Sequence, residues 1–342
     1  MSDKLNVITG ATGQVGSNIA ELLIEQGERV RALVRYSSDV SFLKTLGVEL
    51  ITVDYANPET LHQGVSGADI VYHCAARVSD WGPWDAFQRE VVDVTKHVLT
   101  ACEKESVGRV LYVSSISAYG HPKVKPGDLI REDAPLGQNP WLWDHYAKAK
   151  QLAEEVARKY PGPITIVRPS WIYGPRDRVT IPRVVPALRS KRVPIIGSGE
   201  NYLNLIFGRD VARGCILAAN HPNTAGEIFN LCSRGELTQK QMLDTLTDAM
   251  KLDRITRHVP FFLVQRVAFL QELFARMIGK KTPPTITRRA VYLIARPTQF
   301  SIEKAKDVLG WQPEVNIKDG VEKTLAWYRA EVEPDLSEET GG

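Results

Sequence analysis

The sequence has few cysteines, a small net charge and no apolar run long enough to cross a membrane. Its four cysteines are dispersed and never show the Cys-x-x-Cys spacing of zinc and redox sites; they are Cys74, Cys102, Cys215 and Cys232. Dispersed cysteines in mostly apolar contexts are typical of buried thiols, so we expect a cytoplasmic protein without a bound metal. Because the first apolar run already begins at Leu5, we expect no signal peptide.

The balance of charge argues against another class of function. With 43 basic and 40 acidic residues the net charge is +3, and no basic run with interleaved aromatics occurs. Nucleic acid is therefore not an expected partner. The composition is otherwise that of an ordinary globular protein, and 342 residues are enough for one large domain or two closely packed ones.

The most informative segment is the glycine-rich start of the chain. An apolar run at residues 5–8 leads into Thr-Gly-Ala-Thr-Gly-Gln-Val-Gly at 9–16, and an amphipathic helical pattern follows to residue 26. Such a turn beside a pyrophosphate needs glycine for the tight bend, for close approach to the phosphates and for packing of the helix on the sheet. The predicted dinucleotide site, with the anion at the helix N-terminus, comprises Gly10, Thr12, Gly13, Gln14, Val15 and Gly16.

The second predicted strand, at residues 29–34, lacks at its end the acidic residue that binds the ribose hydroxyls of NAD. Arg35 stands there instead, and a guanidinium can pair with the 2′-phosphate of NADP. We therefore expect NADP as the preferred cofactor and NAD as the alternative. Asp54, after a third predicted strand at 48–53, is a candidate partner of the adenine amino group, and Tyr55 beside it belongs to the same predicted site.

Strands and helices alternate along the first half of the chain. Short apolar strands are predicted at 70–73, 109–114 and 164–168, with long helices at 85–105 and 145–160 between them. This alternation predicts an α/β fold with a Rossmann-type doubly wound parallel sheet over residues 1–168. We expect residues 169–330 to form mainly a smaller C-terminal substrate-binding lobe, interleaved with the sheet, and residues 331–342 a flexible acidic tail.

A second motif carries the chemistry. Tyr146 and Lys150 are four residues apart on a predicted helix and therefore share one face, while Ser115 follows the strand at 109–114. A phenol has a free pKa of about 10, and a neighbouring ammonium favours its ionised form. We expect Tyr146 to exchange a proton with the substrate oxygen as hydride is transferred. Lys150 is expected to lower the pKa of Tyr146 and to bind the nicotinamide ribose, and Ser115 to orient the reacting oxygen.

These motifs, in this order, resemble those of the extended short-chain dehydrogenase/reductases, and the likeness runs from about residue 4 to residue 328. Further similar segments are His-Cys-Ala-Ala at 73–76, Val-Ser-Ser-Ile-Ser-Ala-Tyr-Gly at 113–120, Arg-Pro-Ser-Trp-Ile-Tyr-Gly-Pro at 168–175 and Leu-Gly-Trp-Gln-Pro at 309–313. The resemblance implies that Ala75, Ala76 and Pro169 adjoin the cofactor. It also implies a homodimer formed through the helices at 85–105 and 145–160. Val91 departs from the asparagine of many relatives, which puts a four-residue proton relay in doubt.

Two kinds of enzyme within this family have to be distinguished. Enzymes that epimerise or dehydrate nucleotide sugars with tightly bound NAD usually carry an arginine for the diphosphate where this chain has Leu203. Arg209 or Arg183 could replace it, so this function stays open as the alternative. The segment with Asn201 and no arginine is similar to the branch of 3β-hydroxysteroid dehydrogenases and dihydroflavonol reductases. That likeness implies an NAD(P)-dependent oxidoreductase acting on a secondary alcohol or ketone of a steroid-, flavonoid- or β-keto-lipid-like substrate.

An apolar substrate needs an apolar pocket. Val78, Trp81 and Trp84, in a loop similar to that of the same branch, and Tyr173 are predicted to line it, although each tryptophan could instead pack its loop on the core. The apolar segment 261–278 is interpreted as a lid or wall of this pocket. Core packing and an interfacial membrane helix are its alternatives, and no stable membrane insertion is expected. A non-catalytic NADP sensor is the third functional hypothesis, and the presence of all three catalytic residues weakens it.

Overall fold

The computed structural model describes residues 4–125, 127–233, 235, 237–295 and 298–333. Its centre is a parallel sheet of seven strands in the order β11-β7-β5-β4-β1-β2-β3. These strands are β1 (Leu5–Thr9), β2 (Arg29–Val34), β3 (Glu49–Thr52), β4 (Ile70–His73), β5 (Arg109–Val113), β7 (Ile164–Pro169) and β11 (Ile228–Leu231). From β1 the chain adds β2 and β3 on one side, and it then crosses back to add β4 on the opposite side of β1. This reversal of strand order creates a topological switch point between β1 and β4. The predicted doubly wound α/β fold is confirmed.

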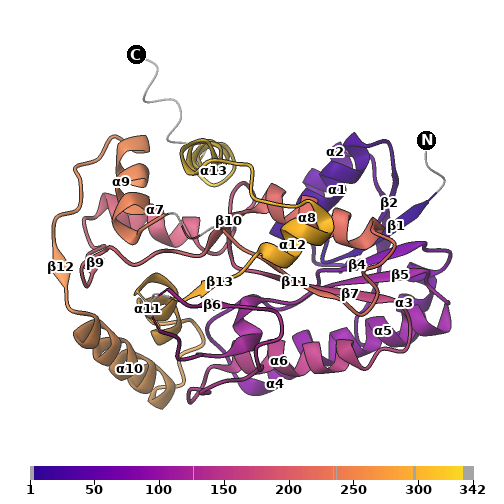
Figure 1. Cartoon of the computed structure of the whole chain (residues 1–342), viewed down its shortest axis with the longest axis horizontal. Helices are drawn as coiled ribbons and strands as arrows, with labels where there is room; N and C mark the ends of the chain where they lie inside the picture. Colours follow the sequence, from indigo (N-terminus) through magenta and orange to yellow (C-terminus); the bar gives the residue numbers. More distant parts are fainter. Residues whose placement is uncertain (1–3, 126, 234, 236, 296–297, 334–342) are drawn as a thin grey trace.

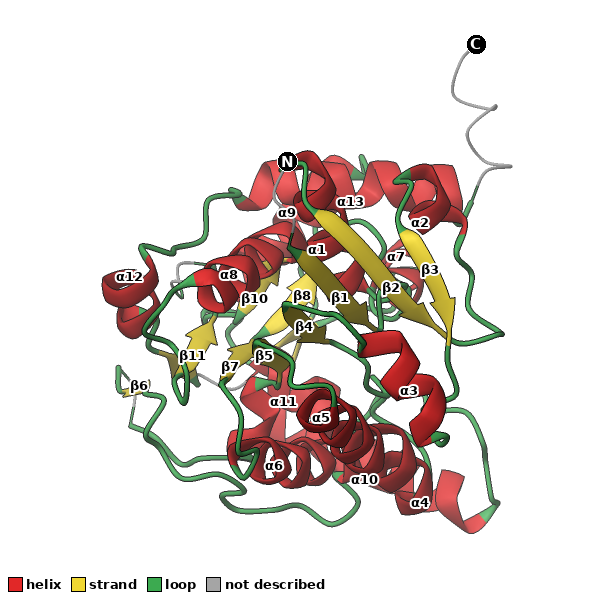
Figure 2. Cartoon of the chain, turned by 90° about the vertical axis from the view of Figure 1, so that its right-hand side faces the viewer, coloured by secondary structure: helices red, strands yellow, loops and turns green. Residues whose placement is uncertain are grey.

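Helices cover both faces of this sheet (Figures 1 and 2). One face carries α1 (Gln14–Glu25) and α8 (Gly208–Asn220), with α2 (Ser41–Thr45) beside α1, and the other carries α3 (Pro58–Val65), α5 (Val94–Lys104) and α6 (His145–Arg158). Every residue of β1 is buried, because a parallel strand is covered on both faces. Its side chains alternate between two cores, with Ile8 on the α1 side and Val7 on the α5 side.

The long helix predicted at 85–105 has a local change of winding. It consists of α4 (Trp84–Phe87), a π-helical segment Gln88–Asp93 and α5. A π-bulge releases a backbone carbonyl from the helix, and here the carbonyl of Glu90 accepts a hydrogen bond from the N–H of Arg77 at 3.3 Å. The bulge therefore attaches the loop after β4 to this helix.

The remaining elements build a lobe at the carboxyl edge of the sheet (Figure 1). They are the 3₁₀ turn Ile116–Tyr119, β6 (Leu129–Ile130), β8 (Trp171–Tyr173), α7 (Ile181–Arg189), β9 (Ile195–Ile196), β10 (Leu205–Phe207), α9 (Gln239–Ala249), β12 (His258–Val259), α10 (Phe261–Met277), α11 (Arg288–Ala295), β13 (Gln299–Phe300), α12 (Glu303–Leu309) and α13 (Ile317–Glu331). Short parallel pairs join β8 to β10, β9 to β12 and β6 to β13.

The lobe and the sheet share segments of the chain. α8 and β11 come from residues 169–330 but lie in the layers of the sheet, and α12 packs on both. Of the predicted tail at 331–342, Glu331 ends α13 and residues 334–342 lie outside the described residues. In the part of the chain that the structure describes, no helix is long and apolar enough to span a bilayer.

Candidate active site

The loop between β1 and α1 forms a cradle at the switch point of the sheet. Gly10 has a φ of +65°, and a Cβ on it would lie 2.7 Å from the backbone of Ala75. A Cβ on Gly16 would lie 2.5 Å from the carbonyl oxygen of Gly10. Gly13 begins α1 without a side-chain cap, and no acidic residue occupies the first turn. The N–H groups of that turn are therefore available to an anion, and the cradle fits the pyrophosphate of a dinucleotide.

Tyr55 supports this loop from the adenosine side. Its hydroxyl accepts a hydrogen bond from the N–H of Gly10 at 3.2 Å and donates to the carbonyl of Leu33 at 3.3 Å. Burial raises the pKa of Tyr55 to about 12, so the phenol stays neutral. Tyr55 thus holds β2 and the glycine-rich loop in register.

The predicted 2′-phosphate and adenine contacts lie on the same side. Arg35 is exposed directly after β2, and within the described ranges no carboxylate forms an ion pair with it. Asp54 is also exposed, and its carboxylate accepts a hydrogen bond from the N–H of Ala56 at 2.9 Å. On the other side of the loop, the amide of Gln14 donates to the carbonyl of Gly174 at 3.4 Å. The cradle is thus joined to the segment that leaves the sheet for the lobe.

His73 lies between the cofactor loop and the catalytic residues and has a structural role. Its ring nitrogens contact the hydroxyls of Thr9 at 2.7 Å and Thr95 at 3.2 Å, and Thr9 in turn accepts a hydrogen bond from the N–H of Ala75 at 3.2 Å. Burial lowers the pKa of His73 to about 3. The neutral imidazole therefore fixes the loop at 73–76, which includes the predicted cofactor residues Ala75 and Ala76.

One face of α6 carries the predicted catalytic pair, Tyr146 and Lys150, and also the acidic residue Glu154. Tyr146, Lys150 and Glu154 follow one another at intervals of four residues, and Asp144 caps the helix by accepting a hydrogen bond from the N–H of Ala147 at 3.2 Å. The Lys150 ammonium is buried and donates to the carbonyl of Val113, at the end of β5, at 2.9 Å. Burial lowers the pKa of Lys150 to about 8.

Ser115 and Tyr146 are brought together at the carboxyl end of β5. Burial raises the pKa of Tyr146, whereas the charge of Arg289 and hydrogen bonding with Ser115 oppose that rise. The guanidinium of Arg289 lies over the phenol ring, 4.4 Å from its centroid. The Ser115 hydroxyl also donates to the hydroxyl of Ser117 at 3.1 Å. The arrangement provides a proton donor, an orienting hydroxyl and a cation at one place.

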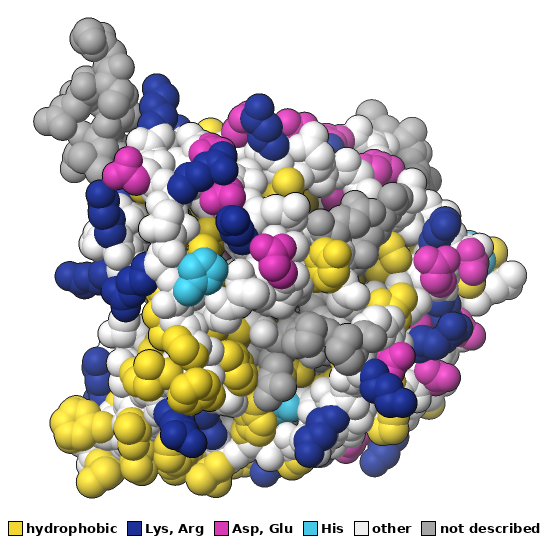
Figure 3. Space-filling model, turned by 60° about the vertical axis from the view of Figure 1, so that its left-hand side comes forward, with side chains coloured by type: hydrophobic (Ala, Val, Ile, Leu, Met, Phe, Trp, Pro, Cys, Tyr) yellow, Lys and Arg dark blue, Asp and Glu magenta, His cyan; other side chains and the backbone are white. Residues whose placement is uncertain are grey.

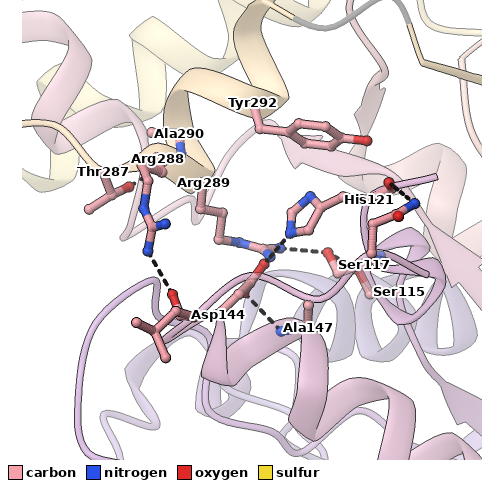
Figure 4. A network of polar contacts seen from close by, with 12 residues as sticks. Ser115, Ser117, His121, Asp144, Ala147, Thr287, Arg288, Arg289, Ala290 and Tyr292 are labelled. Atoms are coloured by element: carbon pink, nitrogen blue, oxygen red, sulfur yellow. Dashed lines mark hydrogen bonds and ion pairs between the residues drawn. The ribbon is translucent and has the colours of Figure 1, made fainter. Parts of the chain in front are cut away.

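Arg289 is the centre of a polar network that joins α11 to the catalytic helix (Figure 4). It donates to the hydroxyl of Ser117 at 2.5 Å and contacts the carboxylate of Asp144 at 3.4 Å. Asp144 also contacts Nε2 of His121 at 2.8 Å. Although burial raises the pKa of Asp144, Arg289 and His121 outweigh that effect and hold it at about 2. The neighbouring Arg288 points the other way, toward the Leu142 carbonyl at 2.6 Å.

A cavity lies beside this network, between the 3₁₀ turn after Ser115, β8 and α11. Its polar and aromatic lining includes Ser117, His121, Trp171, Asn204, Arg289 and Tyr292. Sequence reasoning missed all six as individual site residues. The available signal was the pair Arg288-Arg289 at the start of an otherwise apolar helix, but its distance in sequence from Tyr146 gave no reason to join them.

The four predicted pocket residues do not belong to the lining of the cavity beside Arg289. The indole of Trp81 is buried and donates to the carbonyl of Lys280 at 2.9 Å. Tyr173 is buried in the core of the lobe, where its ring meets that of Phe207. Neither belongs to the lining of the cavity beside Arg289.

The other two predicted pocket residues also lie outside that lining. Trp84 lies against α6, with the ammonium of Lys148 4.4 Å from its ring centroid. Val78 is exposed. For Trp84, packing of the loop on a helix is the arrangement that the structure displays.

The residues weighed for a sugar diphosphate are engaged in other contacts. Leu203 is buried in the core of the lobe, and Arg209 forms an ion pair with Glu25 on α1. Arg183 lies 3.5 Å from Asp80 and is half-exposed. Both arginines that could replace an arginine at position 203 therefore already face a carboxylate.

Comparisons with known proteins agree with this geometry. Residues 6–232 match the model of the NAD dependent epimerase/dehydratase family. The chain is 26% identical to a 2-alkyl-3-oxoalkanoate reductase of Stenotrophomonas maltophilia, over 94% of this chain and 98% of that protein. It is 26% identical to a decarboxylating sterol-4-alpha-carboxylate 3-dehydrogenase of Mus musculus, over 93% of this chain and 89% of that protein. Its fold is similar to that of a UDP-glucuronic acid 4-epimerase from Bacillus cereus in complex with NAD, with a TM-score of 0.73, 20% identity, and coverage of 95% of this chain and 99% of that one.

Proposed function

This chain belongs to the NAD dependent epimerase/dehydratase family, whose members are enzymes, and on that basis we propose a specific reaction for it. The protein transfers a hydride between a nicotinamide cofactor and a ketone or secondary alcohol of a hydrophobic molecule. The observation that carries the proposal is the partly buried Tyr146, which has the Ser115 hydroxyl and the Arg289 guanidinium beside it. These groups suit proton exchange at a carbonyl oxygen.

The chain's own residues handle the proton and the orientation of the substrate. When bound, the nicotinamide cofactor supplies the hydride for reduction and accepts it for oxidation. Tyr146 donates its phenolic proton to the carbonyl oxygen during reduction and takes a proton from the hydroxyl during oxidation. Ser115 would hydrogen-bond the reacting oxygen, and Lys150 would hold the ribose of the bound cofactor. Burial keeps Tyr146 protonated near neutral pH, the state that reduction requires.

We further propose that the substrate carries a carboxylate on the carbon next to the reacting one. The names of both relatives place a carboxylate there, in a 2-alkyl-3-oxoalkanoate and in a sterol-4-alpha-carboxylate oxidised at position 3. Arg289 is the cation beside Tyr146, and its planar group retains donors beyond those used by Ser117 and Asp144. A guanidinium binds a carboxylate through paired hydrogen bonds. The preferred cofactor is NADP, because Arg35 follows β2 where NAD-binding proteins have an acidic residue.

The experiment is oxidation of a long-chain 2-alkyl-3-hydroxyalkanoate with NADP⁺, followed by absorbance at 340 nm. The methyl ester of the same compound is the matched substrate without the negative charge. We expect NADPH to form faster with the acid than with the ester. Tyr146→Phe is expected to lower kcat by about 10²- to 10⁴-fold with cofactor affinity retained. Tyr160→Phe, after the end of α6, is the matched control.

Three outcomes would contradict the proposal. A wild-type rate for Tyr146→Phe would show that Tyr146 does not transfer the proton. Equal rates for the acid and the ester would show that the enzyme does not recognise a carboxylate on the substrate. Conversion of a nucleotide sugar without net formation of NADPH would show that the protein is an epimerase or dehydratase and not a net oxidoreductase.

A further inference from the structure

The outward face of α10 is apolar along its whole length. Leu263, Val267, Leu270, Phe274 and Met277 recur at alternating spacings of four and three residues, which puts them in one stripe on a helix. Such a stripe ordinarily faces a core. Here these five side chains are 46%, 41%, 60%, 63% and 76% exposed.

The opposite face holds the helix on the lobe. Val264 and Ala268 are buried in a small cluster with Ile196 and Val291. Next to this cluster Glu272 forms an ion pair with Arg288 at 2.8 Å. α10 is therefore anchored on one side only, and its second apolar face remains at the surface. Figure 3 shows an extended hydrophobic area on this side of the molecule, interrupted by basic side chains.

The charged residues of the segment that carries this face have almost all one sign. Between Asp253 and Glu303 the sequence contains nine Lys and Arg residues and a single acid, the buried Glu272. The chain as a whole carries a net charge of only +3, so its positive charge is concentrated here. The exposed cations at this face are Arg257 before α10, Arg266 within it, and Lys280 and Lys281 after it. In the part of the chain that the structure describes, none of these four forms an ion pair with a carboxylate.

We propose that the outward face of α10 binds the surface of an anionic lipid bilayer, with its apolar stripe inserted between lipids and its cations against the headgroups. An exposed apolar helix face bordered by Lys and Arg fits that partner, because burial of apolar area and attraction to anionic lipid add together. A second copy of the chain fits less well. A symmetric contact through this face would bring the same unpaired cations together, and the one acid among the described residues 254–295, Glu272, is buried and already paired with Arg288.

This binding surface adjoins the candidate active site. The ring of Phe269 stacks on that of Trp143, and the guanidinium of Arg276 lies 4.9 Å from the centroid of the Trp143 ring. Trp143 directly precedes Asp144, the cap of the catalytic helix α6. A hydrophobic molecule dissolved in the bilayer would therefore meet the protein beside the end of α6 that carries Tyr146.

The test is cosedimentation of the purified full-length protein with vesicles, without cofactor or substrate. One set contains phosphatidylcholine with phosphatidylglycerol and the other phosphatidylcholine alone. We expect binding to the anionic vesicles, weakened by added salt, and little binding to the neutral ones. The double variant Leu270→Glu/Phe274→Glu is expected to lower binding by at least about tenfold. Its matched control is Val308→Glu, an exposed apolar position on α12.

A second pair of variants tests the charge. Lys280→Gln/Lys281→Gln is expected to weaken binding to anionic vesicles by about 30-fold, because each lysine near the surface contributes about 1 kcal/mol, whereas Lys318→Gln/Lys323→Gln on the exposed side of α13 leaves it unchanged. Absence of binding at low salt, or equal binding by wild type and Leu270→Glu/Phe274→Glu, would overturn the proposal. So would a dimer in light scattering that this variant dissociates, because the occupant would then be a second copy. Since no reaction is measured, the outcome is independent of the proposed enzymatic function.

Discussion

At the scale of single residues, the protonation of Tyr146 is a balance between opposing effects. Burial favours the neutral phenol, while the positive charge of Arg289 and the hydrogen bond with Ser115 favour the phenolate. Ser115 and Tyr146 come from the sheet domain, whereas Arg289 comes from α11 in the lobe. A residue of the lobe therefore also affects the pKa of the proposed proton donor.

Arg289→Met is expected to raise the pKa of Tyr146 further, because an attractive charge at the ring is lost. The alkaline rise of kcat/KM for alcohol oxidation, which requires the phenolate, should move to higher pH with it. Arg289→Lys keeps the charge and should restore the profile in large part. Arg266→Met, on the surface of α10, serves as the control. An unchanged profile in Arg289→Met would show that the guanidinium has no electrostatic effect on the phenol.

Arg35 is the residue on which the proposed preference for NADP depends. Arg35→Ser should weaken NADPH binding by roughly tenfold or more, through loss of a charge-assisted contact with the 2′-phosphate, and leave NADH binding nearly unchanged. Fluorescence titration with both cofactors measures the two affinities. The matched control is Arg29→Ser at the other end of β2. If the variant lost affinity for both cofactors equally, Arg35 would not distinguish them.

At the scale of elements, α6 is joined to the sheet by a buried ionic network. Glu154 accepts hydrogen bonds from Ser114 at 2.6 Å and from Arg168 at 2.6 Å, and the side chains of Glu154 and Arg168 are fully buried. Ser114 follows β5 and Arg168 lies in β7, so one carboxylate attaches the catalytic helix to two strands. The same helix face carries Tyr146 and Lys150. The network thus fixes the helix that carries the proposed catalytic residues Tyr146 and Lys150.

Glu154→Gln should lower the free energy of unfolding by about 3–5 kcal/mol, because the buried Arg168 would lose its counter-charge. Urea unfolding followed by circular dichroism measures the loss. Glu155→Gln is the matched control, since its neighbouring carboxylate is only partly buried and contacts Gln151 on the same helix. A variant as stable as wild type would mean that this pair does not hold α6 on the sheet.

At the scale of the whole molecule, the sheet carries the glycine-rich loop and Tyr146, and α11 of the lobe packs beside Tyr146. The ion pair of Asp144 with Arg289 is one of the contacts between the two parts at the candidate site. The carboxylates of Asp144 and Glu154 both have lowered pKa values, through the positive charges that face them. The homodimer expected through α5 and α6 stays a prediction, and light scattering would test it.

The stability of the molecule should therefore fall on acidification. A carboxylate with a lowered folded-state pKa contributes its full stabilisation above its unfolded pKa and loses it as pH falls through the folded value. For Asp144 this window runs from 3.8 down to about 2. We expect the midpoint temperature of thermal unfolding to fall as the pH is lowered through this window. The fall should be smaller for Asp144→Asn than for the control Asp307→Asn, whose aspartate is exposed in the wild type. Identical slopes would exclude Asp144 as a source of the acid sensitivity.

The sequence by itself determined the features that depend on neighbours along the chain. The spacing of glycines after an apolar run predicts a dinucleotide-binding loop. At positions 10 and 16 only glycine fits, because a Cβ there would collide with neighbouring backbone atoms. The four-residue interval between Tyr146 and Lys150 puts them on one helix face, and alternating strands and helices predict a parallel sheet.

Only the tertiary structure decided what surrounds Tyr146. Arg289 is far from Tyr146 in sequence, and its place over the ring depends on how α11 folds back on the sheet. The predicted pocket residues Trp81 and Tyr173 are aromatic, but residue type does not specify whether a ring faces a cavity or a core. For α10, periodicity revealed an apolar stripe, but the packing of the lobe decided that this stripe faces outward. Local spacing fixes local geometry, whereas contacts between distant segments are set by the packing of the whole chain.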